Sequence, residues 1–161
     1  MGSTSKEIGT LQLWRLVKTE HVATAFDGEG AYRFGGRWNS RGQRVVYASS
    51  TLSLALLEIL VHIDATGPMP AMSAIPIEVP ADAIYSEEFS KLNQVTGGLP
   101  WSLGQTRSWG DDWNQSRKAV AMQVPSAIVP LESNYLLNPS HPSFQDLKIG
   151  DPHRFELDAR L

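Results

Sequence analysis

The chain has 161 residues, 42% of them hydrophobic and 19% charged, which is the length and composition of one ordinary globular domain. A net charge of −3 argues against direct binding to DNA or to an anionic membrane surface, so any anion site must be local. The absence of cysteine excludes disulfides, thiolate metal sites and a cysteine nucleophile.

The N-terminal stretch MGSTSKEIGT is polar and lacks the apolar core of a signal peptide. We expect residues 1–10 to be disordered or tag-like and residues 11–161 to form one domain. The longest apolar run, LSLALLEILVHI, is too short to span a bilayer and is interrupted by Glu58. These features predict a cytoplasmic protein without membrane contact.

The segment LQLWRLV alternates in polarity and predicts a first strand that carries Arg15 on the same face as Leu13. The following residues 27–43 contain glycines at 28, 30, 35, 36 and 42, which predicts a loop without regular structure. RVVYASS, residues 44–50, then predicts a short strand that carries Tyr47.

The arginines of this loop allow two interpretations. We expect Arg41 and Arg44 to be solvated charges. Arg37 differs because it lies between two glycines and Trp38, where a ligand can approach the backbone and a guanidinium can match a phosphate. Neither GxxxxGK[ST] nor GxGxxG occurs, so the loop belongs to neither of the common phosphate-binding patterns.

Residues 52–63 predict a helix capped by Ser50 or Thr51 and buried nearly all round. Glu58 in this apolar run is a candidate functional carboxylate, because a buried charge is costly unless it is paired. The alternatives are that Glu58 reaches solvent or ties down a structural arginine. His62, one turn later, is expected to have at most a supporting role; the histidines are scattered and predict no metal site.

The rest of the chain predicts short elements. MSAIPIEVP is strand-like, with Pro76 placing it at an edge or a bulge. Residues 108–122 predict an amphipathic helix, and SAIVPL, SNYLLN, DLKIG and HRFEL predict short strands. Ser126, in VPSAIVP, is a small polar residue among apolar ones without a nucleophile elbow around it. Together, the predicted helices and strands indicate a single α+β domain with a mostly antiparallel sheet and a buried helix.

Five segments occur in an order that resembles the RES domain family: LWRLV, GGRWNSRGQRVVYASST, LALLEILVH, VPSAIVP and NYLLNPSHP. The resemblance runs from about Leu13 to the C-terminus. It implies an ADP-ribosyltransferase-like fold and the toxin of a type II toxin–antitoxin pair that consumes NAD⁺. It also implies an Xre-like helix-turn-helix antitoxin as partner.

By motif match, the family's glutamate falls on Glu58 and its serine on Ser126. We place its arginine at Arg37, with Arg15 as a second candidate. The resemblance implies that these arginines hold the pyrophosphate, that Tyr47 stacks on nicotinamide and that Ser126 orients the carboxamide or the ribose. Glu58 would stabilise the ribosyl cation, and neutral nicotinamide would leave without a general acid.

Three alternatives remain open at the level of the sequence. The acceptor of the ADP-ribosyl group could be water, inorganic phosphate or a protein side chain. A non-catalytic module that binds RNA or nucleotides through the Gly-Arg-Trp loop is a rival of another class. A purely structural or interaction domain is the third.

Overall fold

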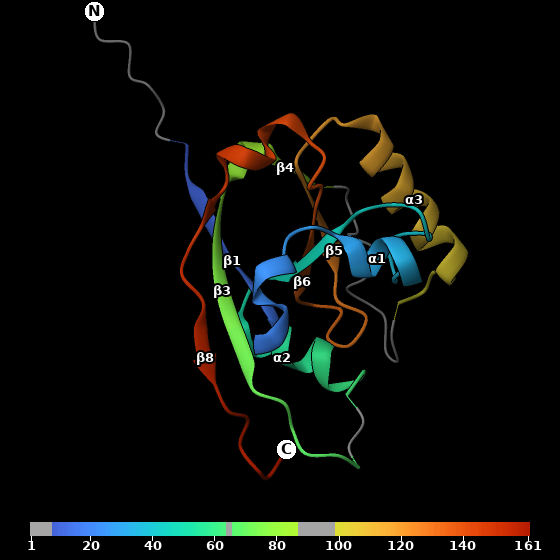
Figure 1. Ribbon diagram of the computed structural model, residues 1–161. Coiled ribbons are helices and arrows are strands. Elements are labelled where there is room, and N and C mark those ends of the chain that lie inside the picture. The colour runs from blue at the N-terminus through green and yellow to red at the C-terminus, as the bar shows by residue number, and fades with distance from the viewer. Residues whose placement is uncertain (1–7, 64–65, 87–98) are drawn as a thin grey trace, which may run out of the picture.

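The computed structural model describes residues 8–63, 66–86 and 99–161 (Figure 1). In this part of the chain the strands are β1 (Thr10–Lys18), β2 (Val46–Ser49), β3 (Met72–Pro80), β4 (Ile84–Ser86), β5 (Ala121–Pro125), β6 (Ser133–Leu137), β7 (Lys148–Ile149) and β8 (His153–Phe155). The helices are α1 (Glu29–Phe34), α2 (Leu52–Leu60) and α3 (Leu103–Ser116), with 3-10 turns η1 (Thr19–Thr24), η2 (Ala81–Ala83) and η4 (Pro142–Asp146). Residues 1–7 of the expected disordered or tag-like segment lie outside the described residues.

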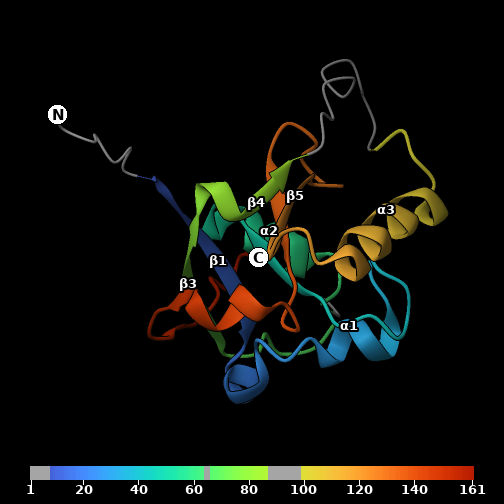
Figure 2. The same cartoon turned by 90° about the horizontal axis from the view of Figure 1, so that it is seen from above.

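The strands form one sheet in the order β4-β5-β6-β2-β1-β3-β7, with β8 also paired to β3. All pairings in the described part are antiparallel except β4 with β5. Figures 1 and 2 show α1 and α3 on the side of the molecule away from β3. This arrangement confirms the predicted α+β class with a mostly antiparallel sheet.

The main core lies on the central strands. Leu13 on β1, Val46 on β2, Ile77 on β3 and Leu137 on β6 are fully buried in one cluster. A second cluster packs Trp38, Val45 and Trp113 against strands β5 and β6, and a third packs α2 on β1 and β3. Buried side chains of β1 and β2 pack into these clusters, and this packing fixes the positions of Arg15 and Tyr47 on the two strands.

The prediction that Pro76 places β3 at an edge or a bulge is wrong. β3 pairs with β1 along its whole length and with two short strands on its other side. β8 pairs with Met72–Ala74 and β7 with Ile77 and Glu78, so Pro76 falls in the gap between them. A residue without an N–H is tolerated there because neither short strand needs a donor from it.

The glycine-rich stretch 27–43 is not devoid of regular structure, because it contains α1. Gly28 and Gly35 lie at the two ends of this helix with φ of 69° and 70°, in the left-handed region that favours glycine. The glycines therefore begin and end the helix instead of preventing it.

The predicted helix 108–122 is shifted toward the N-terminus. Ser102 and Gln105 form a capping box that begins α3, and Arg117 ends it with a φ of 52°. The apolar residues from Val120 onward belong to the core instead, and Ala121–Pro125 form β5. SAIVPL is not a strand but a turn, since the Ser126 hydroxyl accepts hydrogen bonds from the N–H groups of Ile128 and Val129.

The helix α2 ends at Leu60 and is not buried nearly all round. Only Leu54 and Ala55 are fully buried, whereas Leu57 and Val61 are 42% and 61% exposed. One face of α2 packs on β1 and β2, and the opposite face meets solvent. Of the two candidate caps, Thr51 is the one used: its side chain accepts a hydrogen bond from the N–H of Leu54.

Gly110 allows α3 to pack directly against the backbone of the loop, which gives a stability prediction. A Cβ at Gly110 would overlap the carbonyl oxygen of Trp38, which is backbone and cannot rotate away. We expect Gly110→Ala to lower the free energy of unfolding by about 3 kcal/mol, the upper end of the overpacking range. Urea denaturation checks this.

The matched control is Gly104→Ala, in the first turn of the same helix. Its new Cβ would meet no atom closer than 3.9 Å, so the helix propensity of alanine should stabilise the protein by about 0.5–1 kcal/mol. Equal effects of the two substitutions would contradict the close approach of α3 to Trp38.

Candidate active site

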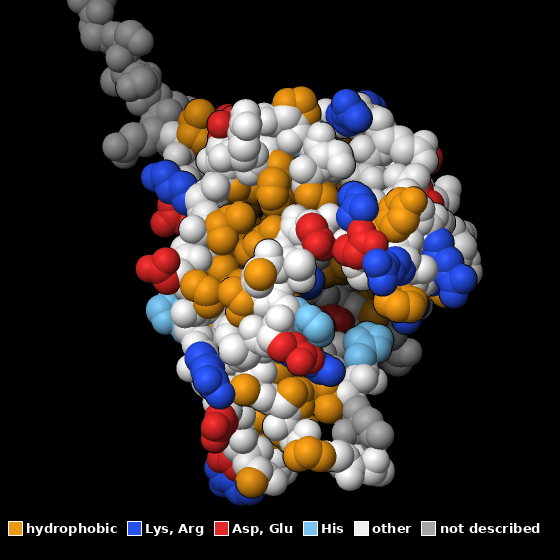
Figure 3. All heavy atoms as spheres, in the orientation of Figure 1, with side chains coloured by type: hydrophobic (Ala, Val, Ile, Leu, Met, Phe, Trp, Pro, Cys, Tyr) orange, Lys and Arg blue, Asp and Glu red, His pale blue; other side chains and the backbone are white. Residues whose placement is uncertain are grey.

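A cavity of about 830 Å³ opens between η1, α1, β2 and α2. Its size is within the range of small-molecule and cofactor sites. Figure 3 shows a hollow on this face of the molecule, with basic, acidic and histidine side chains gathered around it. Arg15, Arg37, Tyr47 and Glu58 all line the cavity, so four of the five predicted site residues converge on one space.

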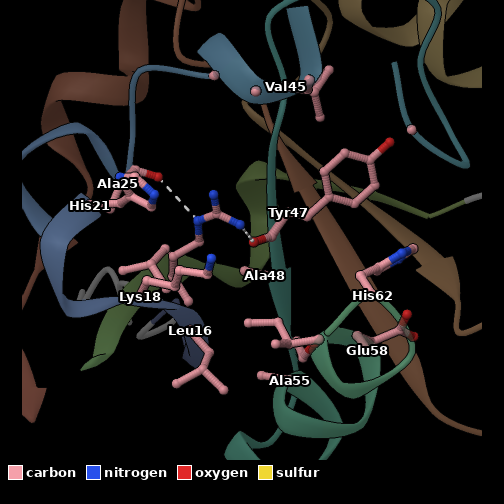
Figure 4. A pocket seen from close by; sticks show the side chains of 18 of the residues that line it. Leu16, Lys18, His21, Ala25, Val45, Tyr47, Ala48, Ala55, Glu58 and His62 are labelled. Atoms are coloured by element: carbon pink, nitrogen blue, oxygen red, sulfur yellow. Dashed lines mark hydrogen bonds between the residues drawn. The ribbon is translucent and has the colours of Figure 1, made fainter. Parts of the chain in front are cut away.

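Glu58 reaches the cavity from α2, half-buried, on the same side of the helix as His62 (Figure 4). Its Oε1 accepts hydrogen bonds from the Ser126 hydroxyl at 2.6 Å and from the Asn134 amide at 2.5 Å. Its Oε2 makes no hydrogen bond or ion pair within the described residues. The carboxylate is therefore held by one oxygen while the other is left for a ligand.

Ser126 lies behind Glu58 rather than in the cavity wall. It is completely buried, and the residues that line the cavity do not include it. Its hydroxyl donates to Glu58 and accepts from the two N–H groups of the turn that follows. The expected contact between Ser126 and nicotinamide or ribose is therefore not offered by this geometry, which instead couples the turn to the carboxylate.

Arg15 is partly buried between η1 and β2. Its Nε donates to the carbonyl of Ala25 and its Nη1 to the carbonyl of Tyr47, both at 3.0 Å, as the dashed lines in Figure 4 mark. Burial lowers the pKa of Arg15 to about 10, with the charge of Asp27 opposing this, so the group remains a cation at neutral pH. Its Nη2 has no hydrogen-bond partner within the described residues.

Arg37 follows Gly36 in the loop, and its side chain is exposed at the cavity wall. The backbone around it is held firmly: Arg107 Nε donates to the carbonyl of Gly36 at 2.8 Å, and Thr106 Oγ1 donates to that of Arg37 at 2.6 Å. A Cβ at position 36 would lie 2.6 Å from the Tyr47 hydroxyl. The glycine is thus required for the close approach of loop and β2, and the loop presents Arg37 on a fixed backbone.

The Tyr47 hydroxyl is hydrogen-bonded to two residues of the loop. It donates to Asn39 Oδ1 at 2.7 Å and accepts from the N–H of Trp38 at 3.1 Å. Burial raises the pKa of Tyr47, so the phenol stays neutral and keeps donating. The ring borders the cavity, and the hydroxyl serves to anchor the loop.

Two asparagines at the site, Asn39 and Asn134, were not predicted from the sequence. Asn39 is completely buried, and its amide donates to the carbonyls of Ala31, Ser40 and Gln43, so it organises the loop. Asn134 lies in SNYLLN, which the sequence correctly predicts to be a short strand. A polar residue one position before a run of buried apolar residues was the available signal, but only the pairing of β6 with β2 directs it to Glu58.

Of the two loop arginines expected to be solvated charges, Arg41 is exposed and Arg44 is half-buried. Arg44 is not merely a solvated charge: it pairs with Glu29 Oε2 at 2.7 Å, donates to the carbonyl of Asp27 and lies over the ring of Tyr32. Arg33 also bonds Glu29, which lowers the pKa of that carboxyl. Arg41 is exposed, as expected.

Besides Glu58, the cavity is lined by four basic side chains, which we call the cationic wall (Arg15, Lys18, Arg33 and Arg37), and by two acidic ones (Asp27 and Glu29). Lys18 and His21 line it from β1 and η1, as Figure 4 shows, in addition to the arginines. Within residues 8–63, 66–86 and 99–161, no cluster of three or more histidine, aspartate or glutamate side chains could hold a metal ion. The helices in the same ranges include none with the length and apolarity needed to cross a membrane.

Residues 12–158 match the RES domain family. The chain belongs to the RES domain family. Two curated relatives of this RES chain are named toxins: Toxin Res of Yersinia enterocolitica, 35% identical over 94% of this chain and 99% of its own length, and Prs ADP-ribosylating toxin of a Sphingobium strain, 36% identical over 94% and 97%. The prediction that the chain is a RES-domain toxin is confirmed at the level of the family.

The RES fold is also confirmed by a solved structure, the Mycobacterium tuberculosis MbcT–MbcA toxin–antitoxin complex. The TM-score is 0.70, with 16% identity over 91% of this chain and 85% of the matched one. At this identity the comparison establishes the fold of the RES domain and nothing finer.

Proposed function

We propose that this RES domain is the toxin of a toxin–antitoxin pair and that it consumes NAD⁺ by breaking the nicotinamide–ribose bond. The observation that carries the proposal is that one hydrogen-bonded carboxylate, Glu58, lines the same cavity as the cationic wall. Glu58 keeps one oxygen free in the cavity, while Arg15, Arg37 and Lys18 line the same space.

The chemistry suits a single carboxylate. When the bond between ribose C1′ and the nicotinamide nitrogen breaks, nicotinamide takes the electron pair and leaves neutral, and the ribose becomes oxocarbenium-like. The free oxygen of Glu58 stabilises this positive charge and accepts a hydrogen bond from a ribose hydroxyl. Such pre-oriented electrostatic groups act strongly in a site shielded from water. The acceptor then adds to C1′ and releases its proton to solvent.

The cationic wall fits the other half of the substrate. The pyrophosphate of NAD⁺ carries negative charge, and Arg15 Nη2 and the Arg37 side chain supply donors for it. Tyr47, whose ring borders the cavity, would stack on the nicotinamide ring. With these assignments the scissile bond would lie next to Glu58.

The acceptor defines the reaction class. Water would make the protein a glycohydrolase, inorganic phosphate a phosphorylase, and a protein side chain an ADP-ribosyltransferase. The relative named Prs ADP-ribosylating toxin favours transfer to a protein as the second candidate.

The family and the fold support an antitoxin as the partner of this chain. The similarity to a toxin within a toxin–antitoxin complex supports an antitoxin for this chain as well, and we propose an Xre-like helix-turn-helix protein that covers the cavity. Co-purification with the product of the neighbouring gene tests this.

The reaction is tested with the purified protein and NAD⁺. Released nicotinamide is followed by chromatography, and the ADP-ribosyl product is identified by mass spectrometry. The reaction is run in phosphate-free buffer, with added phosphate, and with purified Prs protein. We expect nicotinamide release under at least one of these conditions. Intact NAD⁺ in all three would contradict the proposal.

A further inference from the structure

A second polar side chain, Asn134, approaches Glu58 from the sheet and is itself held by a buried serine. Asn134 Nδ2 donates to Glu58 Oε1 at 2.5 Å, and Ser49 Oγ donates to Asn134 Oδ1 at 2.7 Å. Ser49 is only 4% exposed. Both Asn134 and Ser49 line the cavity.

The sheet brings these residues together. Ser49 on β2 and Asn134 on β6 are directly paired in the antiparallel register. Ser49 is the last residue of β2, and α2 begins three residues later, so the same strand end delivers both the serine and the helix that carries Glu58.

The direction of the hydrogen bonds matters. An asparagine amide can rotate by a half turn and present oxygen instead of nitrogen to a neighbour. Its oxygen would then repel the carboxylate of Glu58. The carboxylate of Glu58 can only accept, so it favours the rotamer in which the amide N–H group faces it, and the hydrogen bond from the Ser49 hydroxyl to Asn134 Oδ1 supports the same rotamer.

We propose that Ser49 and Asn134 are positioning residues that aim the carboxylate of Glu58. Asn134 and Ser126 both bind Oε1, which turns Oε2 toward the cavity. Ser49 acts only through Asn134. This inference rests on the proposed cleavage of NAD⁺ for its kinetic consequences, but the hydrogen-bond chain itself can be tested without any substrate.

The kinetic test uses Asn134→Leu, which keeps the side-chain size and removes the donor, and Ser49→Ala. We expect Asn134→Leu to lower kcat for nicotinamide release about 10²-fold, the scale expected when a reacting group is misplaced. Ser49→Ala, which removes one orienting hydrogen bond, should lower kcat about tenfold. KM for NAD⁺ should change less than threefold in both, because neither residue is assigned to substrate binding.

Two further variants separate positioning from general stability. The double variant should be no slower than Asn134→Leu alone, since Ser49 has nothing left to orient. The matched control is Ser73→Ala: Ser73 is also buried in the sheet and bonds Thr19 Oγ1, but it does not line the cavity. It should lower the melting temperature about as much as Ser49→Ala and leave kcat unchanged. Additive losses, or an equal loss of kcat in Ser73→Ala, would overturn the proposal.

The substrate-free test is the side-chain amide signal of Asn134 in a ¹H–¹⁵N spectrum, assigned by its absence in Asn134→Leu. A short bond to a carboxylate should shift one amide proton well downfield, and the shift should shrink in Glu58→Gln and in Ser49→Ala but not in Ser73→Ala. A signal that is unchanged in both Glu58→Gln and Ser49→Ala overturns the hydrogen-bond chain. Because this readout needs no NAD⁺, it stands even if the wild-type protein releases no nicotinamide, which would instead overturn the proposed function.

Discussion

Replacing Glu58 by glutamine should lower the rate of nicotinamide release from NAD⁺ by about 10²–10³-fold, the loss typical when a pre-oriented electrostatic group is removed. Glutamine keeps the length and shape of glutamate but not its charge. Its amide oxygen can still accept the hydrogen bonds from Ser126 and Asn134, so the helix and the turn should remain in place. The loss should therefore appear in kcat.

Two measurements make this result specific. The melting temperature of Glu58→Gln should stay close to that of the wild type, which excludes unfolding as the cause. Ser73→Ala, outside the cavity, should keep the wild-type rate of nicotinamide release. If Glu58→Gln turned over NAD⁺ as fast as the wild type, Glu58 could not be the group that stabilises the ribosyl cation.

The second large effect is expected at Arg15. In the Glu58→Gln background, where turnover is suppressed, Arg15→Met should weaken NAD⁺ binding by about 2 kcal/mol, or roughly 30-fold in Kd, because a charge-assisted hydrogen bond to the pyrophosphate is lost. Isothermal titration calorimetry measures this directly.

The controls for Arg15 address its structural contacts. Arg15→Met also removes the bonds to the carbonyls of Ala25 and Tyr47, so Arg15→Lys is made alongside to keep the charge. We expect intermediate binding for lysine, which lacks the planar fork of arginine. Arg41→Met, an exposed loop arginine outside the cavity wall, should bind like the parent. Equal losses at Arg15 and Arg41 would show that only net charge matters.

The sequence predicted those parts of the fold that local patterns determine. The strands β1 and β2 and the capped start of α2 were predicted correctly because each is specified by its own residues. The helix α1 is not predictable from composition, because its glycines at 28 and 35 resemble those of an irregular loop but lie at its two ends. The exposed face of α2 was missed because the presence of an apolar side chain does not tell whether another element covers it.

The residues of the candidate site were predictable from the sequence, but the position of Ser126 and the contacts of Asn134 were not. Glu58 was predicted because it is a charge in an apolar helix. Arg15, Arg37, Tyr47 and Ser126 were predicted from the resemblance to the RES domain family. The position of Ser126 behind Glu58 could not be predicted, because it depends on the turn that follows β5. Asn134 and Ser49 are 85 residues apart and meet only through strand pairing, which no local pattern specifies.

The most direct test of the account is a crystal structure of the Glu58→Gln variant soaked with NAD⁺. We expect the dinucleotide in the cavity, with ribose C1′ and the nicotinamide nitrogen beside residue 58 and the pyrophosphate against Arg15 and Arg37. NAD⁺ bound with its adenine end at residue 58, or bound outside the cavity, would contradict the account.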